Sequence, residues 1–94
     1  MTNFKKIELK NNNEEHIEKE ATILMLQLLE ICKKHNLTIN VLGPAKPPVS
    51  KIKNTYTRKI YLKGKNNKLM GAIFKSIDLS KYSSRIFFTP NPLN

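Results

Sequence analysis

The sequence predicts an α+β fold: a βαββαβ ferredoxin-like two-layer sandwich, in which a four-stranded antiparallel sheet carries two helices on one face. Four short segments alternate apolar and polar residues, as half-buried strands do. Two other segments repeat apolar residues every three or four positions, as amphipathic helices do. The 94 residues are enough for a single domain, 1–94, with a small core.

The clearest helical pattern runs from about Asn13 to His35. Its apolar positions recur on one face, and they are Ile17, Ala21, Leu24, Leu28 and Ile31. Asn12 is the expected N-cap, with Glu15 three residues further on as in a capping box. More apolar residues widen this face, namely Ile23, Met25, Leu26, Leu29 and Cys32. We favour a wide core face under the sheet; the alternative is a second contact surface.

The four expected strands cover residues 4–9, 38–42, 56–63 and 85–89. In the third of them, Ile60 and Leu62 point to one face, and Lys59, Tyr61 and Lys63 point to the other. The proline-rich stretch 43–51 is expected to be a loop of extended geometry. A shorter helix is expected over 68–77, with inward-facing apolar residues at Leu69, Met70, Ile73 and Ile77.

Positive charge is concentrated in the second half of the chain. The formal net charge is +10, yet residues 1–42 hold six basic and six acidic residues. Residues 43–94 hold eleven basic residues, and Asp78 is their only acid. Such asymmetry indicates a polyanionic partner, although a solvated basic surface would give the same counts.

Catalytic and metal-binding patterns are not found in the sequence. There is no glycine-rich phosphate loop, and the acids form no metal-ligand spacing with a histidine or with Cys32, the only cysteine. His16 stands among glutamates and is interpreted as a solvated surface residue. We therefore expect no enzyme activity and no cofactor. With no signal-peptide pattern and no long apolar run, we expect a cytoplasmic protein without a membrane partner.

The segment 46–63 carries the candidate site, because basic residues alternate there with aromatic rings. Cations in such a row can follow a phosphodiester backbone, and a ring between them can stack on a base. The candidate nucleic-acid-binding residues are Lys46, Lys51, Lys53, Tyr56, Arg58, Lys59, Tyr61 and Lys63. This hypothesis requires them to form one contiguous cationic surface. A basic groove near Lys65 and Lys68 is a candidate docking site for an acidic peptide.

The stretch Val41–Lys63 resembles the C-terminal domain of PriA, the primosomal replication-restart helicase (primosomal protein N′). The outright matches are Val41, Leu42, Gly43, Pro44, Pro48, Tyr56, Leu62 and Lys63. The flanking elements follow in a similar order, so the resemblance covers nearly the whole chain. The sequence departs from the family pattern at Asn54, where the family has glycine, and at Thr55 and Thr57, where it has basic residues.

The resemblance implies a bacterial cytoplasmic domain that helps to recognise stalled forks in replication restart. The implied partners are single-stranded or branched DNA, the remaining domains of the helicase, and single-stranded DNA-binding protein. The family's ATPase lobes and zinc-binding cysteines have no counterpart in this chain. We therefore expect an excised part of a longer helicase or a stand-alone relative. The alternative is a stand-alone protein-docking or RNA- or ribosome-associated module of the same fold.

Overall fold

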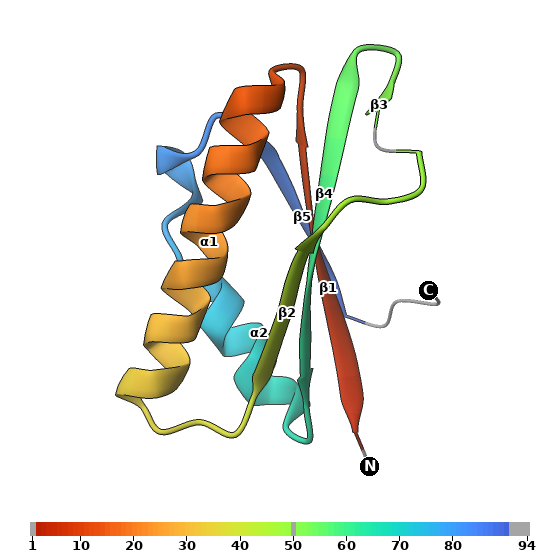
Figure 1. Ribbon diagram of the computed structural model, residues 1–94. Helices are drawn as coiled ribbons and strands as arrows, with labels where there is room; N and C mark the ends of the chain where they lie inside the picture. Colours follow the sequence, from red (N-terminus) through yellow and green to blue (C-terminus); the bar gives the residue numbers. More distant parts are fainter. Residues whose placement is uncertain (1, 50, 91–94) are drawn as a thin grey trace.

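The protein is described by a computed structural model, which covers residues 2–49 and 51–90. It has an α+β fold with two helices and an antiparallel sheet of five strands, as the sequence predicts at the level of class. The elements are β1 (Asn3–Asn11), α1 (Glu14–Lys34), β2 (Asn40–Ala45), β3 (Lys51–Ile52), β4 (Thr55–Gly64), α2 (Asn67–Lys75), a 3-10 turn (Leu79–Lys81) and β5 (Arg85–Thr89). Both helices lie on one side of the sheet, and none of the described residues forms a helix over the other side (Figure 1).

The strands are ordered β2-β4-β1-β5, and β3 pairs with β4. The central pair is long: β1 runs antiparallel to β4 from Asn3 opposite Gly64 to Asn11 opposite Tyr56. The sequence predicts four strands, but the structure has a further one, β3, at the end of the proline-rich stretch. A two-residue loop joins β3 to β4. Its residues, Lys53 and Asn54, have φ of 50° and 62°, as a type I′ hairpin turn requires.

The core lies between the sheet and the helices. It contains Ile7 and Leu9 of β1, Ile60 and Leu62 of β4, and the α1 residues Ile17, Ala21, Leu24, Leu28 and Cys32. The predicted helical stripe is therefore confirmed, except that Ile31 is only half-buried and Cys32 is buried. The N-cap is Asn13 and not Asn12: the Asn13 side chain accepts a hydrogen bond from the His16 backbone N–H at 2.9 Å.

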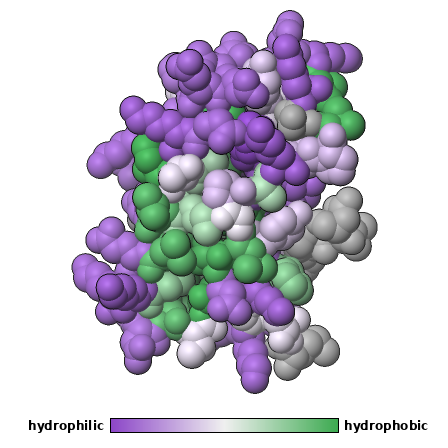
Figure 2. All heavy atoms as spheres, viewed as in Figure 1, coloured by the Kyte–Doolittle hydropathy of each residue, from purple (hydrophilic) through white to green (hydrophobic). Residues whose placement is uncertain are grey.

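The prediction of a wide core face on α1 holds for Met25 and Cys32, which pack in or against the core, and is wrong for the other three residues. Ile23, Leu26 and Leu29 are 44%, 60% and 40% exposed. A sheet packed against a helix covers only the side chains on the helix face turned toward the sheet. Ile23, Leu26 and Leu29 therefore project sideways or outward from α1. Figure 2 shows apolar side chains gathered over the lower part of this view, among hydrophilic ones. Neither helix of the described part of the chain combines the length and hydropathy that a membrane-crossing helix needs.

Candidate nucleic-acid interface

Arg58 does not face solvent as the phosphate-binding hypothesis requires. In β4 it has the same orientation as Ile60 and Leu62, which places its side chain beneath α1, where it is only 2% exposed. Its Nε and Nη2 both donate to Oε1 of Glu18, the former at 2.6 Å, and Nη1 donates to the Thr57 carbonyl at 2.8 Å. The guanidinium is thus used in an internal ion pair, and Arg58 is removed from the candidate interface.

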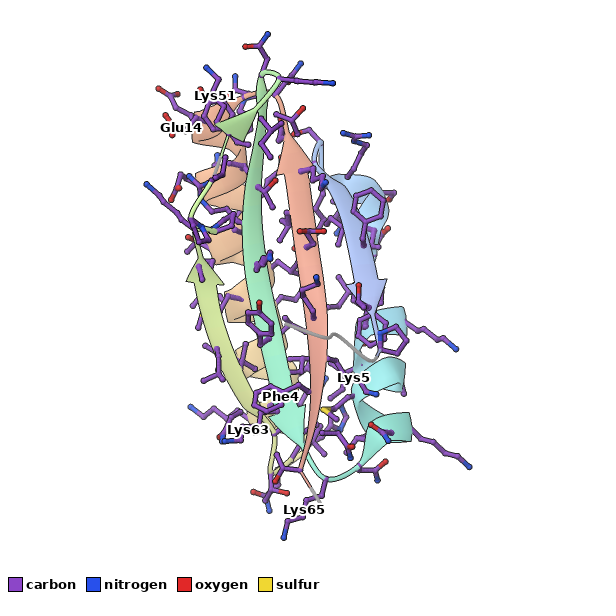
Figure 3. All side chains as sticks on the ribbon, turned by 90° about the vertical axis from the view of Figure 1, so that its right-hand side faces the viewer. Phe4, Lys5, Glu14, Lys51, Lys63 and Lys65 are labelled. Atoms are coloured by element: carbon purple, nitrogen blue, oxygen red, sulfur yellow. The ribbon has the colours of Figure 1, made fainter. Side chains whose placement is uncertain are left out.

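Tyr56 and Lys51 also lie on the helix side of the sheet. Tyr56 is paired with the buried Asn11 and packs against the core as a half-buried ring. Lys51 is opposite Tyr56 in the β3–β4 pair, and its Nζ lies 5.3 Å from the centre of the Tyr56 ring. In Figure 3, Lys51 is at the same end of the molecule as Glu14, where α1 begins. The eight candidate residues therefore do not form one contiguous surface.

Lys59, Tyr61 and Lys63 do lie together, on the side of the sheet that no helix covers. Cross-strand neighbours in an antiparallel pair point to the same face. The register thus adds side chains from β1, β2 and β5 to this surface, which we call the open face. Its residues are Phe4, Lys6, Glu8, Lys10, Asn40, Leu42, Thr57, Lys59, Tyr61, Lys63, Arg85, Phe87 and Thr89.

The open face is strongly cationic. It carries Lys6, Lys10, Lys59, Lys63 and Arg85 against a single acid, Glu8. In the described part of the chain both ion pairs involve Arg58, so no cation of the open face has a carboxylate within 4.0 Å. The Nζ of Lys63 lies 5.5 Å from the centre of the Phe4 ring, and the two side chains are seen together in Figure 3. The cations are therefore available to an external anion.

The remaining candidate lysines lie around the rim of the sheet. Lys46 is exposed just after β2, and Lys53 is exposed at the tip of the β3–β4 hairpin. Lys65 and Lys68 are exposed near the start of α2. A shallow hollow of about 360 Å³ includes Lys63, Gly64 and Lys65 in its lining, but not Lys68. The predicted basic groove thus contains only one of its two lysines.

Sequence reasoning missed five of the eight basic and aromatic residues of the open face, namely Phe4, Lys6, Lys10, Arg85 and Phe87. The signal was present in the alternation of the first strand, where Phe4, Lys6 and Lys10 share one parity. What the sequence could not give was the strand order. Only that order places β1 beside β4 and β5 beside β1, so that cations distant in sequence become neighbours.

Two acids of α1, Glu18 and Glu20, are bound to other segments of the chain. Burial alone would raise the pKa of the Glu20 carboxyl, but hydrogen bonds from Ser83 and Ser84 outweigh burial and hold the pKa below its ordinary value. These bonds include Ser83 Oγ at 2.6 Å and the Ser84 N–H at 2.8 Å. Burial, followed by the charge of Glu20, raises the pKa of the Tyr82 hydroxyl. These contacts fasten the segment before β5 to α1.

Across residues 2–49 and 51–90, no three histidine, cysteine, aspartate or glutamate side chains gather in an arrangement that could hold a metal ion. Comparison with models of known protein families and with curated proteins gives no match for this chain. The candidate interface therefore depends on its own geometry and charge.

Proposed function

We propose that the protein is a non-catalytic DNA-binding domain of the kind found at the C-terminus of PriA-type primosomal helicases, acting in the bacterial cytoplasm in replication restart. The strand order supports a ferredoxin-like sandwich. The strands that flank α1 are parallel to one another, with β4 between them and antiparallel to both. The fold and the resemblance of Val41–Lys63 agree with the proposal. Because one fold can serve many functions, the argument for DNA binding is made from the residues of the open face.

One observation carries the proposal: five cations and one acid share the open face. Bound to a nucleic acid, these cations would replace counterions condensed on the phosphates, and the release of those counterions would drive binding. With five phosphate contacts, the plot of log affinity against log salt should have a slope of about −3.5 for a single strand. Lys46 and Lys53 at the rim would extend the contact to the second arm of a branched substrate.

The test is fluorescence anisotropy with a labelled forked oligonucleotide at several salt concentrations. The informative variant is Lys59→Gln/Lys63→Gln, which removes two cations of the open face. We expect weaker binding at low salt and a slope that is less steep by about 1.4, because each of the two lost phosphate contacts contributes about −0.7. The matched control is Lys33→Gln/Lys34→Gln, two exposed lysines at the end of α1. Equal losses in the two double variants would contradict an interface on the open face.

A second candidate function, docking of another protein, is favoured by one observation. Ile23, Leu26 and Leu29 leave an apolar strip on α1. In the helicase reading, this strip would pack on the remaining domains of the enzyme. Analytical ultracentrifugation of the chain with the separately expressed helicase core, repeated with Leu26→Asp, distinguishes this role from DNA binding. A complex that survives Leu26→Asp would exclude docking through α1.

A further inference from the structure

We infer that the open face holds single-stranded DNA by stacking unpaired bases on Phe4, Tyr61 and Phe87, with the lysines between them contacting the phosphates. This inference rests on the proposed function and deepens it, because it specifies the strand state of the DNA and assigns a base-contacting role to two residues outside the predicted site.

The three rings belong to three neighbouring strands. Phe4 lies on β1, Tyr61 on β4 and Phe87 on β5. Phe4 and Phe87 are each 45% exposed, which is unusual for phenylalanine on a sheet that could have buried them. Tyr61 is half-buried among its neighbours. Among the described residues, no hydrogen bond involves the Tyr61 hydroxyl, whereas the Tyr82 hydroxyl donates to Gln27.

The register sets the spacing of the rings. Phe4 is opposite Lys63, and Lys6 is opposite Tyr61, so Phe4 and Tyr61 are diagonal neighbours, about 7–8 Å apart at the backbone. Phe87 of β5 is opposite Glu8 of β1. It is therefore two strands away from Tyr61 of β4 and two residues further along the strand direction. Strand spacing and rise then place it about 12 Å from Tyr61. An extended strand of three or four nucleotides spans such a set.

Cations lie between the rings at the positions that phosphates would occupy. Lys63 lies against Phe4, and Lys6 is opposite Tyr61; Phe87 has Glu8 opposite it and Arg85 two residues away on the same face of β5. A neutral or apolar protein surface would leave these like charges buried and unpaired, whereas a polynucleotide supplies one phosphate for each base. The alternation of exposed rings and cations therefore favours a nucleic acid as the occupant.

The flat shape of the surface favours unpaired bases. In a duplex the flat faces of the bases are stacked on one another, and only their edges reach a protein through the grooves. Within the described residues, the sheet surface that bears the three rings has no helix that could enter a groove (Figure 1). It does present flat apolar surface, which is what an unstacked base needs.

The experiment measures anisotropy at one low salt concentration with three labelled probes. They are an oligothymidine of about 12 nucleotides, a chain of the same length in which most bases are replaced by abasic sites, and a duplex of the same length. Stacking predicts that the oligothymidine binds more tightly than both other probes. Equal binding of the abasic chain would overturn the inference and leave the proposed function standing. Absence of binding to all three probes would instead overturn the proposed function.

Ring variants then locate the stacking. Phe4→Ala and Phe87→Ala should each weaken oligothymidine binding by about 5- to 150-fold, with an unchanged salt slope because no cation is removed. Tyr61→Phe keeps the ring and should bind as wild type does, whereas Tyr61→Ala should not. Leu26→Ala, an exposed apolar truncation on α1, is the matched control and should have no effect.

Unchanged affinity in both phenylalanine variants would overturn the inference, provided thermal melting shows that they are folded. Tighter binding of oligouridine than of oligothymidine would overturn the assignment to DNA.

Discussion

Replacing Glu18 with alanine should destabilise the protein through Arg58. The guanidinium is 2% exposed, and Glu18 accepts two of its hydrogen bonds. In the described part of the chain the only other carboxylate within reach is that of Glu14, 4.0 Å away. Without Glu18, a buried cation would keep only the Thr57 carbonyl as a close partner. We therefore expect a lower free energy of unfolding.

The size of the loss follows from exposure. Breaking a fully buried pair costs about 3–5 kcal/mol, and one hydrogen bond to a charged group contributes about 1.5–3 kcal/mol. The Glu18 side chain is 50% exposed, so water can replace part of what is lost. We expect a loss of about 2 kcal/mol, which lowers the melting temperature of a domain of this size by about 8–16 °C.

The assay is thermal unfolding followed by circular dichroism. Lys19→Ala is the control, because it changes one charge on the next residue of α1 and should stay within about 0.5 kcal/mol of wild type. A second variant, Arg58→Met, removes the buried charge together with its pair and should cost less than Glu18→Ala. Its DNA affinity should stay within about twofold of wild type, since Arg58 reaches no phosphate. Equal melting of Glu18→Ala and Lys19→Ala, or a large loss of DNA binding in Arg58→Met, would refute this reasoning.

Three further outcomes are expected. Because the pKa of the Glu20 carboxyl is lowered, its stabilising contribution is complete above the ordinary carboxyl pKa of 4.5 and is lost as the pH falls through the folded-state pKa. The melting temperatures of wild type and of Glu20→Gln should therefore converge as the pH falls through that range. Gly43→Ala should cost about 2 kcal/mol in urea unfolding, because φ is +115° and the added Cβ would lie 2.7 Å from the Lys59 carbonyl oxygen; an unchanged midpoint would contradict this. Burial raises the pKa of the Cys32 thiol, so an aromatic disulfide reagent should modify it far more slowly in the native state than in urea, and a fast native reaction would show that the site opens.

The parts of the fold that local patterns determine could be predicted from the sequence. The last strand was predicted with its observed bounds, and the helical stripe of α1 was predicted in all but one position. The two faces of β4 were also correct, because side chains alternate strictly in a strand. Prolines made the stretch after β2 look like a loop. Pro44 nevertheless lies within β2, which tolerates it as an edge strand.

The candidate site was predictable only in part, because a positive charge does not specify its partner. Arg58 and Lys59 are adjacent basic residues, but one is beneath α1 and the other is on the open face. The alternation already indicated this division, since Arg58 shares its parity with Ile60. Grouping the cations by sequence proximity ignored that parity. It also excluded Lys6, Lys10 and Arg85, which strand pairing brings to the same face.

The two sides of the molecule differ in net charge. On the open face five cations stand against one acid, whereas α1 carries five of the seven acids and three lysines, and the lysines of α2 and of the 3-10 turn keep the helix layer from being net negative. The Cα trace extends 17 Å along its shortest axis, about twice the Debye length of roughly 8 Å at physiological salt. The field of the open face is therefore screened from that of the helices. A polyanion should bind the open face in preference to the helix layer. The apolar strip of α1 lies in the helix layer, so a protein bound there would leave the open face accessible. Lys59→Gln/Lys63→Gln should then lose DNA while retaining any docking through α1.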